Sequence, residues 1–283
     1  MSMVSLNHLI DLETYPIEDP DAESYRALVR RCRDQFADAV SCHLPGFLRE
    51  AAVAPMLGEI DARHDSANLY SVHRGAYNRE DPRSAAHLVS LAEDDPRARP
   101  QRRHQLWLGT DDLSRESSLC TMYDWPALTR FVRDVLGVDE LYTLDDPLMR
   151  ILINIHRDGD ELGWHVDSHD YAVTLLLRPA LEGGLYQYVP MSGPGDDNFA
   201  YCTKLFDGDV SRVRTVPMDV GSMVIFRGRN TLHRVTPVTG PRHRALALFS
   251  YESVPGRVYG SSFRMNLLGR ADPRPLGGAS KPA

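Results

Sequence analysis

The chain has 283 residues, which is enough for one substantial hydrophobic core with a smaller helical part beside it. Its 42% hydrophobic and 25% charged residues are typical of an ordinary soluble globular protein. The formal charge of −7 and the pI near 5.9 argue against a nucleic-acid-binding surface, which would favour basic stripes. Nucleic acid is therefore not an expected partner.

The cysteines and the apolar runs bear on the cellular compartment. No Cys-x-x-Cys pair occurs, so neither a zinc knuckle nor a redox motif is expected from Cys32, Cys42, Cys120 and Cys202. Reduced thiols in a cytoplasmic protein are the simple interpretation. The N-terminus lacks the basic and apolar regions of a signal peptide, and no apolar run approaches the ~18 residues that span a bilayer. We expect a cytoplasmic protein without a membrane partner.

The spacing of apolar residues predicts three helices in the first half of the chain. The first is expected over residues 22–40, where apolar side chains recur at helical intervals. The second is expected over residues 48–63, where Pro55 would kink or divide it. The third is expected over residues 123–136, with Gly137 as its stop. We expect all three to pack against a sheet and to take no part in catalysis.

Residues 65–118 are polar and show little periodicity, which predicts a long irregular stretch. Such a stretch inside a compact domain is typical of a lid or a binding loop. Arg74 or Arg103 would pair there with a substrate carboxylate, although an exposed charge is the more ordinary role of either side chain. Arg74 is the candidate substrate-binding residue of this stretch.

Short apolar strands separated by glycine and proline turns begin at Met149. They predict a mainly β fold, a double-stranded β-helix (the cupin-like jelly roll), flanked by N-terminal helices. The acidic loop 192–209 would cover its open mouth. The expected strands are Met149–His156, Trp164–Asp167, Tyr171–Leu177, Leu185–Val189, Val213–Val216, Met223–Phe226, His233–Val235 and Ala245–Tyr251.

These patterns predict a single domain over residues 1–283, in which no internal repeat is apparent. A helical and lid portion would occupy residues 1–140. The jelly-roll core with the metal site would occupy residues 141–270, and a C-terminal tail would follow over residues 271–283.

Two imidazoles and one carboxylate form the strongest chemical pattern. His165 and Asp167 are two residues apart, and His233 follows much later. On a strand, residues i and i+2 share a face about 6.6 Å apart, so both side chains can lean over one metal. The third ligand would come from a neighbouring strand. Such a set suits a mononuclear iron(II) site that activates oxygen and leaves coordination positions open.

A binding site for a dicarboxylate co-substrate is expected beside that metal. Arg242 and Arg244 lie nine and eleven residues beyond His233, where a guanidinium would hold a carboxylate by a fork of two hydrogen bonds. Arg244 is the first choice, although strand parity does not separate the two. Asn154, an amide inside an apolar run, needs a hydrogen-bond partner, which a bound acid or the neighbouring backbone would supply.

Longer motifs carry a family resemblance. Residues 149–252 resemble the core of an iron(II)/2-oxoglutarate-dependent oxygenase. The segments GDELGWHVD (159–167) and FRGRNTLHRVTPV (226–238) are similar to one branch of it, the radical halogenases of free amino acids and their hydroxylating relatives. The resemblance extends upstream to YDWPALT (123–129), and it is weak over the first hundred residues.

The resemblance implies iron(II) and 2-oxoglutarate as cofactors, with oxygen and a small, free amino acid or derivative as substrates. In the halogenases a small residue replaces the carboxylate ligand, and halide takes the vacated position. Asp167 is present here, so the resemblance implies hydroxylation of an unactivated carbon. Trp164, His169 and Asp170 are candidates for the substrate side of the site because they lie close to the ligands in sequence.

Three alternatives remain open at this point. The same cofactors would also serve desaturation, cyclisation or epimerisation. A non-catalytic jelly-roll binding protein with a structural metal would show no 2-oxoglutarate turnover. A zinc hydrolase is a weaker alternative, because the helical His-Glu-x-x-His arrangement is absent. The sequence leaves the oligomeric state open.

Overall fold

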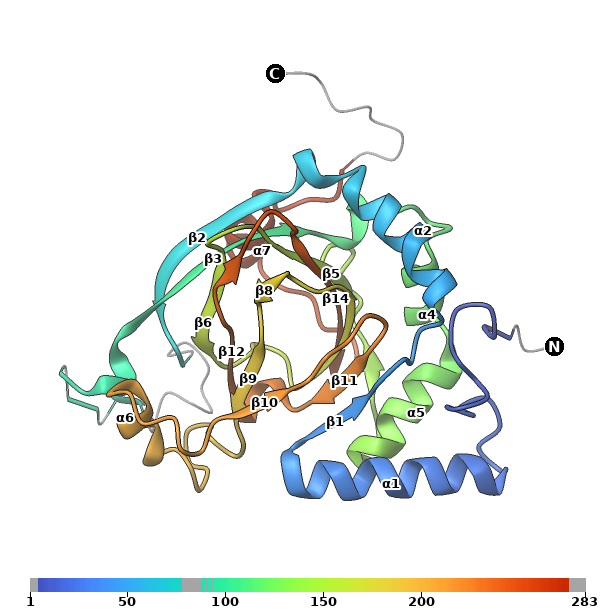
Figure 1. Ribbon diagram of the computed structural model, residues 1–283, viewed down its shortest axis with the longest axis horizontal. Helices are drawn as coiled ribbons and strands as arrows, with labels where there is room; N and C mark the ends of the chain where they lie inside the picture. Colours follow the sequence, from blue (N-terminus) through green and yellow to red (C-terminus); the bar gives the residue numbers. More distant parts are fainter. Residues whose placement is uncertain (1–4, 78–87, 90, 93, 275–283) are drawn as a thin grey trace.

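Antiparallel strands curl into a nearly closed barrel in the computed structural model, which describes residues 5–77, 88–89, 91–92 and 94–274 (Figure 1). This architecture confirms the predicted double-stranded β-helix with helices beside it. Its helices are α1 (Glu23–Ala39), α2 (Glu50–Asp61), α4 (Ser118–Tyr123), α5 (Pro126–Leu136), α6 (Tyr201–Phe206) and α7 (Ser261–Leu268). Its strands are β1 (Ser41–Leu44), β2 (Asn68–Gly75), β3 (Pro100–Leu108), β4 (Tyr142–Thr143), β5 (Ile151–His156), β6 (Glu161–His165), β7 (Tyr171–Arg178), β8 (Glu182–Gly183), β9 (Tyr186–Val189), β10 (Arg214–Val216), β11 (Met223–Phe226), β12 (Leu232–Val235), β13 (Val238–Thr239) and β14 (Arg244–Glu252).

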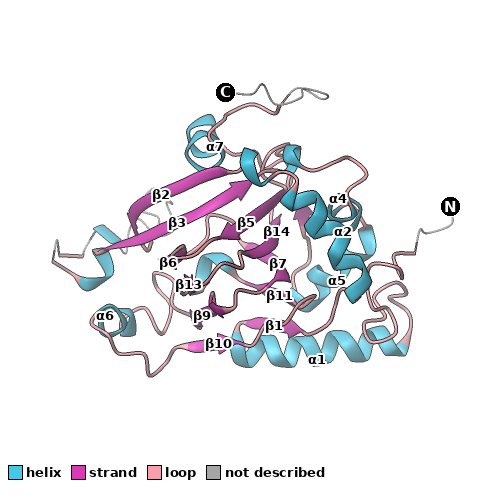
Figure 2. Ribbon diagram, turned by 45° about the horizontal axis from the view of Figure 1, so that its top comes forward, coloured by secondary structure: helices cyan, strands magenta, loops and turns pink. Residues whose placement is uncertain are grey.

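The helices and the longest hairpin lie on different sides of the barrel. Helices α1, α2, α4 and α5 lie along one side (Figure 1). Strands β2 and β3 pair along their whole length and extend past the barrel on the other side, with α7 packed on them (Figure 2). The barrel therefore has one wall backed by helices and one wall made by a long two-stranded extension.

Strand order brings segments that are distant in sequence side by side. The main sheet runs β1-β11-β7-β14-β5-β3-β6-β12-β9-β10, with β2 added to β3 and β4 added to β14. Strand β6 is thereby paired with β12, although about seventy positions separate them in the sequence. This pairing is what joins the two halves of the expected metal site.

Alternation along β14 shows how the sequence assigns the two faces of the barrel. Ala247 and Phe249 pack outward into the core beneath the helices, whereas Leu246 and Leu248 face the interior. Successive side chains of a strand point to opposite faces, so the same parity turns Arg244 inward. A buried cation at the first residue of this strand thus lies inside the barrel.

The helix predictions are confirmed for two segments and corrected for the third. Residues 22–40 form α1 and residues 48–63 form α2, which continues through Pro55 without a break. The expected helix over 123–136 is α5, which ends before Gly137 as expected but begins at Pro126; Tyr123 is the last residue of the preceding helix α4. The amide at the first helical position has no partner within the helix. Proline, which has no amide proton, therefore loses no hydrogen bond there and begins a helix readily.

The irregular stretch predicted over residues 65–118 is wrong in its main part. It holds the paired strands β2 and β3, although residues 78–87, 90 and 93 lie outside the described part. The strands escaped prediction because the face that would normally be apolar carries polar groups such as Arg103 and Gln105. These groups line a cavity instead of a hydrophobic core.

Two details near the expected metal site also differ. Strand β6 begins at Glu161 and ends at His165, so Asp167 lies just beyond a strand and not on it. The segment 192–209 contains α6 and contributes no residue to the cavity described below, so it does not cover its mouth. Helix α6 instead contacts the short turn at Pro96–Ala98.

The boundaries of the predicted single domain stay a prediction. A single domain is favoured because β2 and β3, from the portion expected to be helical and lid-like, belong to the same sheet as the core strands.

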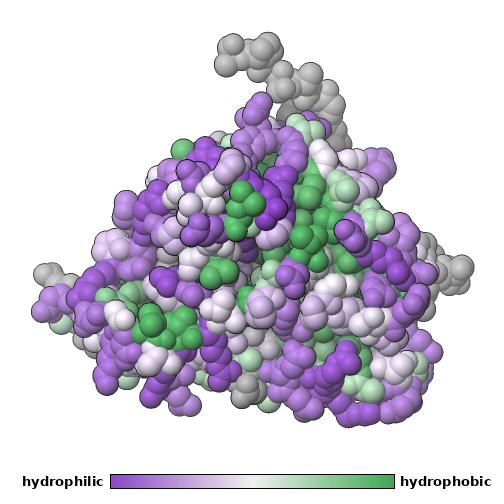
Figure 3. Space-filling view, viewed as in Figure 1, coloured by the Kyte–Doolittle hydropathy of each residue, from purple (hydrophilic) through white to green (hydrophobic). Residues whose placement is uncertain are grey.

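Most of the face shown in Figure 3 is hydrophilic, and its hydrophobic residues gather in a few separate patches. Within the described residues, no helix has the length and apolar character needed to cross a membrane.

Candidate active site

The two histidines expected as metal ligands meet where β6 pairs with β12. His165 and His233 are directly opposed in register, and their ring centroids are 4.1 Å apart. Both side chains are buried, with residue exposures of 6% and 4%. The register of this one strand pair therefore places both imidazoles on the inner face of the barrel.

A backbone carbonyl fixes the orientation of each ring. His165 Nδ1 lies 2.9 Å from the Gly163 carbonyl, and His233 Nδ1 lies 2.7 Å from the Thr231 carbonyl. A carbonyl only accepts hydrogen bonds, so each Nδ1 carries the proton and each Nε2 keeps a free lone pair. This is the arrangement that metal-bound histidines use to fix their tautomer.

Asp167 completes the set from the segment after β6. Its Oδ1 atom lies 3.5 Å from Nε2 of both histidines, and one donor atom of each of the three residues falls within 4.8 Å of the others. Its backbone amide donates to the Gly228 carbonyl at 3.0 Å, which fixes the turn. The three donors thus converge, as the sequence predicts, with the carboxylate held by a turn instead of a strand.

Burial and charge keep these groups in the forms that bind metals. Burial lowers the pKa of His165 to about 4, with a further contribution from His233, so this imidazole is neutral at pH 7. Burial alone would raise the pKa of Asp167, but His233 and His169 together hold it well below its usual range. A neutral imidazole and an ionised carboxylate are the ligating forms.

Gly228 lies directly against the Asp167 carboxylate. A Cβ atom at Gly228 would come within 2.3 Å of Asp167 Oδ2 and 2.8 Å of Asp167 Cβ. No real side chain fits at such distances, so the glycine is required by close approach. On the same oxygen, His169 Nε2 approaches to 3.3 Å. Oδ1 faces the two ligand histidines while Oδ2 is enclosed by Gly228 and His169.

A cavity of about 160 Å³ is lined in part by His165, Asp167 and His233. Arg244 lines it at 2% exposure, and its Nη1 atom has no hydrogen-bond partner among the described residues. Burial lowers the pKa of Arg244 only to about 10, so the guanidinium stays charged at pH 7. Asn154 lines the same cavity with its amide nitrogen unpartnered. A buried cation needs an anion, and the carboxylate of 2-oxoglutarate fits this requirement.

Arg242 lies elsewhere. It is exposed, its Nη2 atom donates to the Ala180 carbonyl at 2.9 Å, and it does not line the cavity. Because β14 begins at Arg244, Arg242 belongs to the turn before the strand. This placement favours Arg244 over Arg242 for the co-substrate.

The four residues expected on the substrate side fall into two groups. Arg74 and His169 line the cavity. Trp164 points out of the barrel, where the Arg234 guanidinium stacks 4.7 Å above its ring. Asp170 does not line the cavity either; its carboxylate pairs with Arg229 at 2.8 Å and accepts from the Ser253 hydroxyl at 2.6 Å. Proximity to the ligands in sequence was therefore a poor guide for these two.

Several cavity residues were not anticipated from the sequence. Strand β3 turns Gln105 and Trp107 inward beside Arg103, which the sequence offers with Arg74 for a substrate carboxylate, and Tyr259 joins them from the segment before α7. Each has a buried nitrogen or oxygen without a partner among the described residues. Polar residues at alternate positions 103, 105 and 107 were the available signal, because they share one face of a strand.

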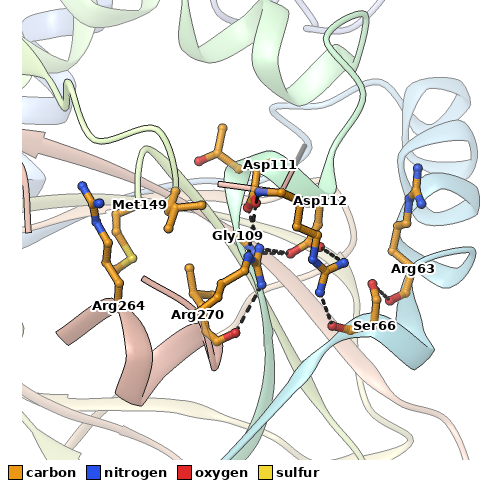
Figure 4. A network of polar contacts seen from close by, with 12 residues as sticks. Arg63, Ser66, Gly109, Asp111, Asp112, Met149, Arg264 and Arg270 are labelled. Atoms are coloured by element: carbon orange, nitrogen blue, oxygen red, sulfur yellow. Dashed lines mark hydrogen bonds and ion pairs between the residues drawn. The ribbon is translucent and has the colours of Figure 1, made fainter. Parts of the chain in front are cut away.

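The C-terminal segment closes the cavity on the side of β2 and β3. Helix α7 contributes Phe263, Asn266 and Leu267 to the lining. Beyond the helix, Arg270 Nη2 binds Asp111 and lies 2.6 Å from Asp112 Oδ2, as Figure 4 shows. These contacts fasten the end of α7 to the segment that follows β3.

Comparison with known proteins identifies the family. A model described as Halogenase D matches residues 98–257, which is more than half of the chain. The chain belongs to the Halogenase D family. This membership confirms the predicted relationship to iron(II)/2-oxoglutarate-dependent oxygenases of the halogenase and hydroxylase branch, and with it the expected enzyme class. Comparison with curated proteins finds no match.

Solved structures with a similar fold support the architecture of this Halogenase D family member. The non-heme α-ketoglutarate-dependent epimerase SnoN from nogalamycin biosynthesis has 15% identity and a TM-score of 0.56, over 90% of this chain and 93% of that one. The carbocyclase SnoK from the same biosynthesis has 14% identity and a TM-score of 0.54, over 88% and 94%. AviO1 from Streptomyces viridochromogenes Tue57 has 13% identity and a TM-score of 0.54, over 81% and 96%. At these identities the likeness concerns the fold.

Proposed function

We propose that this Halogenase D family member hydroxylates an unactivated carbon of a small amino acid or derivative, using iron(II) and 2-oxoglutarate. The observation that carries the proposal is the position of Asp167, whose Oδ1 atom lies 3.5 Å from both ligand imidazoles. A carboxylate occupies the position that a halogenase leaves open for halide. Oxygen transfer is therefore favoured over halogen transfer.

Two groups of residues would bind the two cofactors. His165, Asp167 and His233 would hold iron(II), and Arg244 would bind the distal carboxylate of 2-oxoglutarate with help from Asn154. With both cofactors bound, the site would support the four-electron reduction of O₂. Two electrons come from the oxidation of 2-oxoglutarate to succinate and CO₂, and two come from the substrate C–H bond. The protein positions the substrate carbon and excludes competing reactions.

The substrate side of the cavity favours a carboxylate. Arg103 Nη2 donates to the Gly75 carbonyl at 2.9 Å, and its buried Nε atom is unpartnered. Arg74 lines the same cavity. Two guanidinium groups in the cavity lining, of which Arg74 is exposed, are suited to an amino-acid carboxylate. The amino-acid class itself comes from the resemblance and is part of the proposal.

Succinate release under iron(II), oxygen and 2-oxoglutarate tests the proposal, with product mass measured across a panel of amino acids. A gain of one oxygen atom, dependent on one amino acid and coupled to succinate, is the expected result. A loss of two hydrogen atoms would instead show desaturation or cyclisation at the same site. No amino-acid-dependent succinate from the panel would contradict the amino-acid hydroxylase proposal.

The cellular location belongs to the same proposal. All four cysteines are free thiols. A reducing compartment keeps thiols in this form and also keeps iron ferrous. We therefore place the enzyme in the cytoplasm.

A further inference from the structure

The charges of the described cavity residues are strongly one-sided. Arg74, Arg103 and Arg244 contribute three guanidinium groups. Among the described residues that line the cavity, Asp167 is the one acid, and it is the proposed iron ligand. A substrate side chain bearing ammonium or guanidinium would therefore enter a cationic site without a carboxylate to pair with. Burying an unpaired charge of this kind is strongly unfavourable.

Glu252 is a buried acid two residues after the cavity-lining Ser250 on β14. It is 4% exposed and does not line the cavity. Its neighbours are His169 and Arg257, whose Nε atom lies 3.9 Å from Glu252 Oε1. Burial raises the pKa of Glu252, which weakens it further as a partner for a cation.

Neutral hydrogen-bonding groups occupy the wall next to Arg103. Gln105 has no exposed surface, and neither its amide nitrogen nor its amide oxygen has a partner among the described residues. The next inward residue, Trp107, also has an unpartnered indole nitrogen. A buried amide with both atoms unsatisfied costs free energy unless a ligand completes its hydrogen bonds.

We propose that Gln105 and Trp107 form the recognition site for a side-chain carboxamide. The substrate is then an amino acid whose uncharged side chain carries a carboxamide, and not a basic amino acid. The inference rests on the proposed function, because Arg103 supplies the carboxylate site that sets the orientation. Inward positions on a strand are about 6.6 Å apart, so a short amino acid can reach from Arg103 to Gln105. The Gln105 amide donates to the ligand oxygen and accepts from the ligand NH₂.

Three ligands of similar length test the inference by anaerobic calorimetry on protein loaded with iron(II) and 2-oxoglutarate. The ligands are L-glutamine, L-norleucine and L-lysine, which end in a carboxamide, a methyl group and an ammonium. Glutamine is expected to bind at least tenfold more tightly than either of the others, because each carboxamide hydrogen bond is worth about a factor of several. Equal or tighter binding of lysine, or binding of none of the three, overturns the inference.

A matched pair of variants assigns the preference to one side chain. Gln105→Met keeps the side-chain length and removes the amide, so glutamine should bind it no more tightly than norleucine does. Gln101→Met makes the same change on β3 outside the cavity lining and should keep the glutamine preference. A preference that survives in Gln105→Met overturns the assignment. Unchanged melting temperatures would show that both variants fold.

Turnover separates this inference from the function on which it rests. Hydroxylation of lysine would overturn the carboxamide assignment and leave the proposed hydroxylase intact. Glutamine that binds with the expected preference but releases no succinate would support the recognition site and contradict glutamine as the hydroxylated substrate.

Discussion

The cavity has two walls that are built in different ways. The cofactor wall consists of His165, Asp167, His233, Arg244 and Asn154, which come from core strands or from the turn after β6. The substrate wall consists of the cavity residues of β2 and β3 together with those of the Tyr259–Leu267 segment, which includes most of α7. Backbone pairing inside the barrel fixes the first wall and also holds β3, whereas ion pairs of Arg270 fasten the C-terminal part of the second wall.

The difference gives the two walls separate roles in the proposed function. Register in the central sheet determines where the metal ligands lie, so a change there alters the reaction itself. Strand β3 lies between β5 and β6, so it is part of the central sheet. Strand β2 and helix α7 lie off the main strand order and pack on β3, so they can change with less effect on the proposed ligands. The proposed function thus assigns the reaction type to the cofactor wall and the substrate choice to the substrate wall.

The largest expected effect comes from removing the carboxylate of the cofactor wall. Asp167→Gly should lower hydroxylation by about 1000-fold, because the third iron ligand is lost. Product analysis in chloride-containing buffer would reveal any chlorinated product at the opened position. Asp139→Gly, at an exposed acid, should leave hydroxylation unchanged. Hydroxylation at the normal rate in Asp167→Gly would refute the ligand assignment.

The second effect separates the two candidate arginines. Arg244→Met should weaken 2-oxoglutarate binding about 100-fold, because charge-assisted hydrogen bonds to a buried cation contribute about 1.5–3 kcal/mol each. Arg242→Met is the matched control, since that side chain is exposed and bonded to a backbone carbonyl. Calorimetric titration with 2-oxoglutarate measures both. The assignment fails if Arg242→Met shows the larger loss.

The third effect tests the packing of Gly228 against Asp167. Gly228→Ala should destabilise the protein by about 1–3 kcal/mol by overpacking and should weaken iron(II) binding about tenfold. In the Asp167→Gly background the same change has no carboxylate to displace, so the stability loss should largely disappear. Denaturant unfolding of the four proteins gives this double-mutant cycle.

Gly58→Ala serves as the control for this cycle. Gly58 lies within α2, and an added Cβ there meets nothing within 4 Å. Alanine is the better helix former, so this variant should be about as stable as the parent or slightly more so. An equal loss of stability from Gly228→Ala in both backgrounds would show that Asp167 is not the group it displaces.

The smallest effect concerns the fastening of the substrate wall. Arg270→Met removes the contacts to Asp111 and Asp112 and should loosen α7. We expect the KM for the amino acid to rise about threefold with the affinity for 2-oxoglutarate unchanged. Arg26→Met, in an exposed ion pair with Glu23, should change neither quantity. Equal losses for substrate and 2-oxoglutarate would contradict the separation of the two walls.

The two walls also differ in what the sequence reveals. The barrel and the convergence of His165 with His233 follow from apolar alternation and from long motifs. Strand parity does not separate Arg244 from Arg242, and Asp167 lies beyond the strand on which it was expected. Strands β2 and β3 were missed because their inward face is polar, so Arg103 and Gln105 look like surface residues. Asp170 was misplaced for another reason: its partner Arg229 is remote in sequence.

The hydrogen bonds of the two ligand rings have a consequence for protein engineering. Each imidazole is oriented by the carbonyl two residues earlier in its own chain segment, Gly163 for one ring and Thr231 for the other. The orientation of both rings is thus determined by two short segments and by the strand pairing between them. Grafting that hairpin-like unit onto an unrelated antiparallel scaffold should transfer most of a ferrous binding site in a single step.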